Sequence, residues 1–204
     1  MKKFFLIVLG LIMSVNIFAA EAPDLFIKKT ADEIFEILKT DKDLKSGHKE
    51  KAFKIAEEKI LPYFDFDRIS RLVLGRAWPA ATKEEQEAFK KEFRKMVAKT
   101  YGAALVKYKD QSLNYKPSRF EPTDEEVLVK TEIIQPGAPP LAVDYLLVKD
   151  GASWKVFDII IEGVSLVTNY RGQFGNEIRQ NGMASLITKL AEKNANFDKT
   201  LSNK

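Results

Sequence analysis

Histidine and cysteine, the residues most used in transition-metal sites and nucleophilic catalysis, are scarce in this sequence. Its 204 residues include one histidine, His48, and no cysteine. These counts argue against the usual zinc and iron ligand sets, and against Ser-His-Asp or Cys-His catalysis unless His48 is the base. His48 lies in the polar segment 45–50, where we expect an ordinary surface residue. The sequence therefore predicts no metal site and no catalytic residue.

Acidic residues are the remaining candidates for chemistry. The 29 Asp and Glu residues always offer carboxylate pairs, but no spacing singles out one pair for acid-base catalysis. Asp158 differs from the others because it lies within a strand-like apolar run, residues 156–161. Strict alternation places it opposite Phe157 and Ile159, so we expect it to face solvent or to pair with an arginine rather than to be buried alone.

The segment 154–190 is the apolar element that would position a binding site. Residues 154–161 are β-branched and aromatic, which predicts a strand. The pattern changes at Glu162-Gly163, after which apolar residues recur at spacings of three and four and predict a helix. Asn181-Gly182 predicts a break before a second helix. Whatever the protein binds, we expect it to be held at the corner between this strand and this helix.

The N-terminus has the pattern of a secretory signal peptide. Lys2 and Lys3 precede an apolar run, residues 4–13, and small residues surround Ala19-Ala20. The run is shorter than the roughly 20 residues of a membrane span, and an uncleaved anchor is the alternative. We therefore divide the chain into a signal peptide, residues 1–20, and a single domain, residues 21–204. Export without cysteines indicates the bacterial periplasm.

The charge balance gives no indication of nucleic-acid binding. The net charge is +4, from 33 Lys and Arg against 29 acidic residues. Removing Lys2 and Lys3 leaves 31 basic residues against 29, a net charge of +2. Binding to nucleic acid requires clustered basic residues, which this balance does not suggest.

Helices are predicted in the first half of the domain. Apolar spacing indicates helices over about 24–38 and 50–61, and Asp65 can cap a short helix that Gly75 closes. Thr82 and Glu85 have the spacing of a capping box, followed by a helix of about 25 residues with one apolar stripe. The polar tail, residues 193–204, is expected to fray.

Strands are predicted after residue 110. The segments 113–120, 127–134, 143–147 and 154–161 read as four strands, and Asp150-Gly151 forms a tight turn before the last. Four antiparallel strands in a meander, with helices before and after, predict an α+β fold with helices packed on one face of a curved sheet.

Three segments resemble the signature of the MlaC family of periplasmic phospholipid-binding proteins, also called the toluene-tolerance or organic-solvent-tolerance auxiliary family. They are residues 64–78, 89–105 and 154–174, and the similarity runs in order from about residue 23 to residue 193. The chain departs from the family pattern at Ala77, where a larger residue is common, and at Pro79, where a basic residue is common.

The resemblance implies a carrier that performs no chemistry and has no cofactor beyond phospholipid as its cargo. It implies a cone-shaped fold like that of nuclear transport factors, with a four-stranded sheet around an apolar cavity. A monomer would carry a diacyl phospholipid between an outer-membrane lipoprotein-porin complex and an inner-membrane transporter complex with an MCE-domain protein. This transport would maintain the lipid asymmetry of the outer membrane.

The resemblance also suggests which residues line the cavity, with ordinary core packing as the alternative for each. The sheet wall would comprise Val143, Tyr145, Leu147, Phe157, Ile159 and Ile161. The opposing helical wall would comprise Leu72, Val73, Leu74, Trp78, Phe93, Val97 and Tyr101. The last side would comprise Val164, Val167, Tyr170 and Phe174. The candidates for contact with a phosphate headgroup or an acidic partner, with structural ion pairs as the alternative, are Arg68, Arg71, Arg76 and Arg171.

Two other functions stay open at this point. An enzyme with the same fold would need a titratable group inside the cavity, and Asp158 is the acid best placed for that role. A periplasmic protein-binding adaptor would have a filled core and would carry no lipid.

Overall fold

The computed structural model describes residues 21–108 and 110–202, so the expected signal peptide lies outside the described residues. The α-helices are α1 (Pro23–Thr40), α2 (Lys42–Lys45), α3 (Lys49–Ile55), α4 (Phe66–Leu74), α5 (Lys83–Leu105) and α6 (Leu166–Ser202). A π-helical turn (Ala56–Ile60) and two 3-10 turns (Leu61–Tyr63 and Gly75–Ala77) connect them. The strands are β1 (Ser112–Tyr115), β2 (Glu126–Ile134), β3 (Leu141–Asp150), β4 (Ser153–Ile161) and β5 (Val164–Ser165).

The strands form one antiparallel sheet in the order β1-β2-β3-β4-β5, so the fold is α+β with the predicted meander. The sheet has five strands rather than the predicted four, because β5 folds back on β4 and Val164 pairs with Ile161. Glu162 and Gly163 make the turn, with φ angles of 49° and 79°. A two-residue strand is too short to show alternation, so its sequence carries no strand signal.

The first strand is shorter than the predicted segment 113–120. It ends at Tyr115, which pairs with Thr131 of β2. The Lys116 N–H still donates to the Lys130 carbonyl at 3.0 Å. Pro117 follows and has no N–H to extend the ladder, so the chain leaves the sheet there.

A β-bulge in β4 breaks the strict alternation on which the sequence prediction relied. Leu146 pairs with Asp158 but Leu147 pairs with Val156, which leaves Phe157 as the additional residue. Val156 and Ile159 therefore share one face of the sheet, and Asp158 lies on the other.

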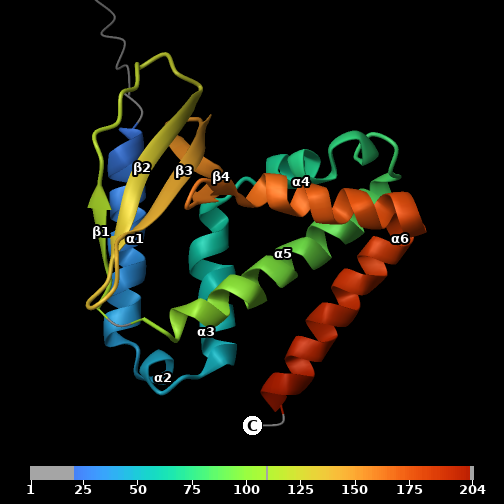
Figure 1. Cartoon of the computed structure of the whole chain (residues 1–204), viewed down its shortest axis with the longest axis horizontal. Helices are drawn as coiled ribbons and strands as arrows, with labels where there is room; N and C mark the ends of the chain where they lie inside the picture. Colours follow the sequence, from blue (N-terminus) through green and yellow to red (C-terminus); the bar gives the residue numbers. More distant parts are fainter. Residues whose placement is uncertain (1–20, 109, 203–204) are drawn as a thin grey trace, which may run out of the picture.

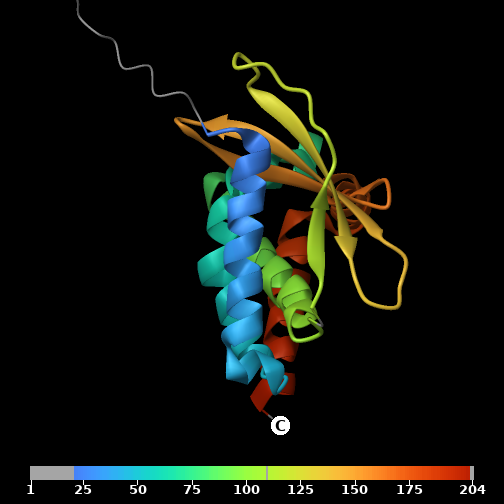
Figure 2. The same ribbon diagram turned by 90° about the vertical axis from the view of Figure 1, so that its left-hand side faces the viewer.

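Two groups of helices pack against the sheet. Figure 1 shows α1 beside the strands, α3 and α5 in the middle, and α4 and α6 on the side away from α1. In Figure 2 α1 lies in front of α3, with the strands running beside it. Phe26 and Ile27 of α1 pack on Leu147 and Val156, which share one face of the sheet. We call this the inner sheet face, and the cluster covers one end of it. At the other end of that face, no residue of α1 is among those that pack on Val143 or line the space beside it.

The largest core lies where α4, α5 and α6 meet β4. Its centre is aromatic: the rings of Phe89 and Phe93 stack at 5.3 Å, and Phe174 contacts them edge-on at 5.7 and 5.4 Å. These rings hold the N-terminal half of α6 against α5, which fixes the wall that α6 presents to the sheet.

Local signals set the helix starts as predicted. The Asp65 side chain accepts from the Arg68 N–H at 2.9 Å and caps α4. At α5 the Thr82 hydroxyl accepts from the Glu85 N–H at 3.2 Å, and the Glu85 carboxylate accepts from the Thr82 N–H at 2.9 Å. Both expected caps are confirmed.

Helix α6 changes direction at Gly182, which confirms the predicted break. The prediction that the tail frays is wrong for the described residues. The tail remains helical to Ser202. Asn194 is buried, and its amide donates to the Glu92 carbonyl and carboxylate at 2.9 Å each. The buried Lys99 ammonium donates to the Asn194 carbonyl at 2.9 Å. Polar contacts of Asn194 therefore hold the tail against α5.

Two glycines of α6 are expected to respond oppositely to alanine. Gly182 has φ 83° and ψ 170°, a conformation in which a Cβ is strained, so Gly182→Ala should lower the free energy of unfolding by about 1–3 kcal/mol. Gly172 is helical with open space at its Cβ position, so Gly172→Ala should raise it by about 0.5–1 kcal/mol. Urea denaturation of both variants tests the pair, and equal effects would contradict it.

Candidate functional site

A cavity of about 260 Å³ lies between the inner sheet face and the helices. The π-helical turn, the segment after it, α4 and α5 contribute Ala56, Ile60, Leu61, Phe64, Phe66, Ile69, Val73, Phe93, Val97, Ala98, Tyr101, Gly102 and Leu105. The sheet and the start of α6 contribute Ile133, Leu141, Val143, Phe157, Asp158, Ile159, Ile161, Leu166, Val167 and Tyr170. Except for Asp158 and the two tyrosine hydroxyls, these side chains are apolar.

The helical wall follows from residue spacing on α5 and from a close helix crossing. Phe93, Val97 and Tyr101 recur every four residues and therefore share one face of α5. A Cβ on Gly102 would lie 3.2 Å from the Ala52 carbonyl oxygen and 3.3 Å from the Ala56 Cβ. Glycine thus lets α5 approach α3 closely, which closes the cavity on that side.

The sheet wall consists of cross-strand pairs at the end of the sheet that α1 leaves uncovered. Ile133 pairs with Leu141, and Val143 pairs with Ile161. Directly opposed residues share a face, so these side chains form a continuous apolar strip. The cavity is therefore the continuation of the α1-covered core.

The cavity opens beside Tyr101. Tyr101 is 36 % exposed, whereas Phe93, two turns earlier on the same face of α5, is 1 % exposed. Leu141 and Leu166 on the facing elements are half-buried. The direction from Tyr101 to Phe93 therefore runs from the open side to the deep end.

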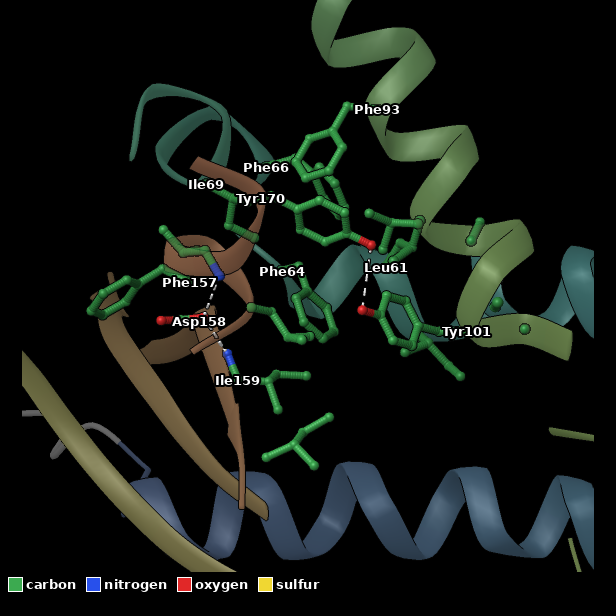
Figure 3. A pocket seen from close by; sticks show the side chains of 18 of the residues that line it. Leu61, Phe64, Phe66, Ile69, Phe93, Tyr101, Phe157, Asp158, Ile159 and Tyr170 are labelled. Atoms are coloured by element: carbon green, nitrogen blue, oxygen red, sulfur yellow. Dashed lines mark hydrogen bonds between the residues drawn. The ribbon is translucent and has the colours of Figure 1, made fainter. Parts of the chain in front are cut away.

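Figure 3 shows the polar groups of the cavity. The hydroxyl of Tyr101, on α5, lies 3.4 Å from the hydroxyl of Tyr170, on α6. The Asp158 carboxylate lies at the corner where β4 passes into α6, and its bonds to backbone N–H groups appear as dashed lines.

Asp158 is buried, contrary to the expectation that it faces solvent or pairs with an arginine. Its carboxylate accepts from the N–H groups of Ile159 at 2.8 Å and Val167 at 3.0 Å, and from the Ser165 hydroxyl at 2.5 Å. These donors replace water and a counter-ion, and Val167 belongs to the first turn of α6, where a carboxylate is favourable. Asp158 thus fixes the corner on which the sequence placed the binding site.

Many of the predicted contact residues line the cavity. The structure brings together Val73, Phe93, Val97, Tyr101, Val143, Phe157, Ile159, Ile161, Val167 and Tyr170.

The other predicted contact residues lie outside the lining. Leu74 and Phe174 are buried in the helical core, and Leu72 and Trp78 pack against it. Leu147 is buried in the core under α1, with Tyr145 packed against it. Val164 is 58 % exposed. Core and lining have the same composition, and a helix turns about 100° per residue, so Val73 reaches the cavity and Leu74 does not.

The four arginines predicted to contact a headgroup or partner lie on α4, on the 3-10 turn after it and on α6. None of them lines the cavity. Arg68 lies 2.5 Å from a Glu126 carboxylate oxygen and 4.0 Å above the Phe157 ring. The Arg171 Nε donates to the Leu72 carbonyl at 2.6 Å. Arg71 lies 6.0 Å from the Trp78 ring, and Arg76 is exposed. Arg68 thus forms an ion pair, and Arg171 forms a hydrogen bond to a backbone carbonyl.

The sequence prediction missed the part of the wall that precedes α4. Ala56 and Ile60 lay within the predicted helix 50–61, and Phe64 and Phe66 lay within the family-like segment 64–78. Ile133 lay in a predicted strand whose alternation could have assigned it to the inner face, together with Thr131. No periodic signal marks the π-helical turn.

Burial near the cavity produces a pH dependence. Burial raises the pKa of the Tyr145 phenol to about 12. An unfolded tyrosine ionises near pH 10, so the stabilisation present below pH 10 is lost as the pH rises toward 12. We expect the free energy of unfolding to fall by roughly 2 kcal/mol over this interval from Tyr145 alone. Urea titrations at pH 9 and 11 should show a smaller loss for Tyr145→Phe, and an equal loss would contradict the assignment.

The described residues contain neither a metal-binding cluster nor a membrane-spanning helix. In the ranges 21–108 and 110–202, no three His, Cys, Asp or Glu side chains lie close enough together to hold a metal ion. Within the same ranges, no helix has the length and apolar character needed to cross a membrane.

Fold and cavity together define an α+β protein with a largely apolar pocket, the kind of site that holds a hydrophobic molecule. The sequence profile described as "MlaC protein" matches residues 28–192. The chain therefore belongs to the MlaC family.

Individual relatives agree with this assignment. The "Toluene tolerance protein ttg2D" of Pseudomonas putida is 27 % identical over 166 residues, which cover 80 % of this chain and 76 % of that protein. The "Intermembrane phospholipid transport system binding protein MlaC" of Haemophilus influenzae is 23 % identical over 177 residues, covering 85 % and 83 %.

A solved structure has the same fold. It is a phospholipid-binding protein from Ralstonia solanacearum in complex with a phospholipid, 33 % identical, with a TM-score of 0.81. The match covers 87 % of this chain and 99 % of that one.

Proposed function

We propose that the chain is a periplasmic phospholipid carrier that shields acyl chains in this cavity. The observation that supports the proposal is an apolar cavity of about 260 Å³ between sheet and helices, whose most exposed lining residue is Tyr101. The phospholipid in the Ralstonia solanacearum relative and the name of the Haemophilus influenzae relative support the choice of ligand. In this proposal the fold is the nuclear-transport-factor-like cone, the chain is a monomer, and residues 1–20 direct export.

The physical reason for a carrier is the cost of exposing acyl chains to water. Each methylene contributes about 0.8 kcal/mol, so thirty methylenes amount to on the order of 24 kcal/mol. A cavity that shields the chains removes most of this cost. The chain would shuttle phospholipid between an outer-membrane lipoprotein-porin complex and an inner-membrane MCE-domain transporter complex, and so maintain outer-membrane lipid asymmetry.

The size of the cavity implies that it widens on loading. A cavity of about 150 Å³ holds one benzene molecule, with six carbon atoms. By this scale 260 Å³ holds on the order of ten carbon atoms, fewer than two long acyl chains contain. We propose that the wall moves at the open side, between the half-buried Leu141 and Leu166 and the end of α5.

Within this proposal the cavity-lining residues named above contact the acyl chains. Arg71, on α4, and Arg76, on the 3-10 turn that follows it, are exposed cations outside the cavity lining. In this proposal they therefore contact a partner surface rather than the lipid headgroup. Arg68 and Arg171 position α4 against the sheet and α6.

The two alternatives are less well supported. An enzyme would use Asp158, but two backbone N–H groups and the Ser165 hydroxyl occupy its carboxylate. An adaptor would have a filled core where this chain has a cavity.

Native mass spectrometry of the mature protein, purified from the periplasm, tests the proposal. We expect a bound mass equal to that of a diacyl phospholipid, near one per chain, and recovery of the lipid by extraction. A ligand-free mass, with no uptake from offered phospholipid vesicles, would refute the carrier and favour the adaptor.

A further inference from the structure

Two hydroxyl groups interrupt the apolar wall at a defined depth of the cavity. The Tyr101 hydroxyl, from α5, and the Tyr170 hydroxyl, from the first half of α6, meet at 3.4 Å (Figure 3). Hydroxyl pairs usually bond at about 2.7–2.8 Å. The pair is therefore loosely bonded, and an acceptor atom can replace either partner at low cost.

The pair has an unused donor. Two hydroxyls carry two protons, and only one proton can lie between the two oxygens. Among the described residues, neither hydroxyl has another hydrogen-bond partner in the structure. Burial, together with the neighbouring Tyr101, raises the pKa of Tyr170, so its hydroxyl stays protonated at neutral pH.

The third polar group of the wall offers no donor. The Asp158 carboxylate accepts three hydrogen bonds and is itself an acceptor. A ligand that places an oxygen acceptor in this cavity can therefore bond only to the tyrosine pair among the side chains that line it.

The position of the pair selects the kind of acceptor. Tyr101 is 36 % exposed and Tyr170 is half-buried, so the pair lies between the open side and the deep end at Phe93. If acyl chains fill the deep end and a headgroup stays outside, the first carbonyl of each chain lies at this depth.

We propose that Tyr101 and Tyr170 donate hydrogen bonds to the ester carbonyl oxygens of a diacyl lipid, so that the cavity selects ester-linked over ether-linked chains. This inference rests on the proposed carrier function and adds the linkage chemistry of the cargo. The hydroxyl pair separates on loading, which matches the widening at the open side.

A competition between two lipids tests the inference. Vesicles hold equal amounts of dipalmitoyl phosphatidylglycerol and its dihexadecyl ether analogue, and native mass spectrometry gives the ratio of the two bound lipids. We expect wild type to favour the ester about threefold to tenfold more than Tyr101→Phe/Tyr170→Phe does. Comparing proteins on the same vesicles cancels any difference in how the two lipids leave the membrane.

Tyr115→Phe is the matched control, because the Tyr115 hydroxyl is buried without a partner and lies outside the cavity. It should keep the wild-type ratio. Equal ratios in wild type and the double variant would overturn the inference, even if both bind lipid. Failure of wild type to bind either lipid would overturn the carrier function instead. If the double variant does not fold, each single variant should lower the ratio, and unchanged ratios in both would overturn the inference.

Discussion

Asp158→Ala is expected to lower the free energy of unfolding by about 3 kcal/mol. The substitution leaves the N–H groups of Ile159 and Val167 and the hydroxyl of Ser165 without their acceptor in a buried corner. A buried donor without a partner costs about 1–3 kcal/mol, and partial relaxation or entry of water limits the sum. Urea denaturation monitored by circular dichroism provides the measurement.

Asp32→Ala is the matched control for Asp158→Ala. The Asp32 side chain is 58 % exposed and pairs with Lys28 on the same helix, so we expect a change within about 0.5 kcal/mol. Asp158→Asn separates the structural role from a catalytic one, because its amide oxygen still accepts from backbone N–H groups. Retained lipid transport in Asp158→Asn would remove the enzyme alternative. A loss below about 1 kcal/mol in Asp158→Ala would contradict the role given to the corner.

The parts of the fold that could be predicted depend on residues near one another in the chain. The capping box at Thr82 involves one helical turn, and the break at Gly182 needs only a residue that tolerates positive φ. The strands of the meander are set by alternation and by turns, so their order along the chain is also their order in the sheet.

The parts that could not be predicted depend on the register between segments. The bulge at Phe157 puts Val156 on the same face as Ile159, and no pattern within β4 reveals this shift. Asp158 meets the first turn of α6, which lies elsewhere in the chain, and needs no arginine. The packing of α1 explains why Leu147 is core and Val143, on the same strand face, lines the cavity. A strand residue becomes core or cavity lining according to the element that faces it from across the sheet. The sequence of the strand alone does not identify that element.

Val143→Trp is expected to reduce bound lipid from near one per chain to less than about a tenth. Val143 is 5 % exposed, lines the cavity from β3, and pairs with Ile161 on the same wall. An indole at this position would occupy much of a cavity of about 260 Å³ that already must widen to admit acyl chains. Native mass spectrometry after incubation with phospholipid vesicles gives the occupancy.

The fold should survive this change, because the added ring enters empty space rather than a filled core, and overpacking costs at most about 1–3 kcal/mol. Leu25→Trp is the matched control: Leu25 is 55 % exposed on α1 and lies outside the cavity, so the same large ring should leave lipid occupancy unchanged. Wild-type occupancy in a folded Val143→Trp would mean that acyl chains do not enter between β3 and α5. An equal loss in Leu25→Trp would mean that the assay reports contact with the vesicle surface rather than entry into the cavity.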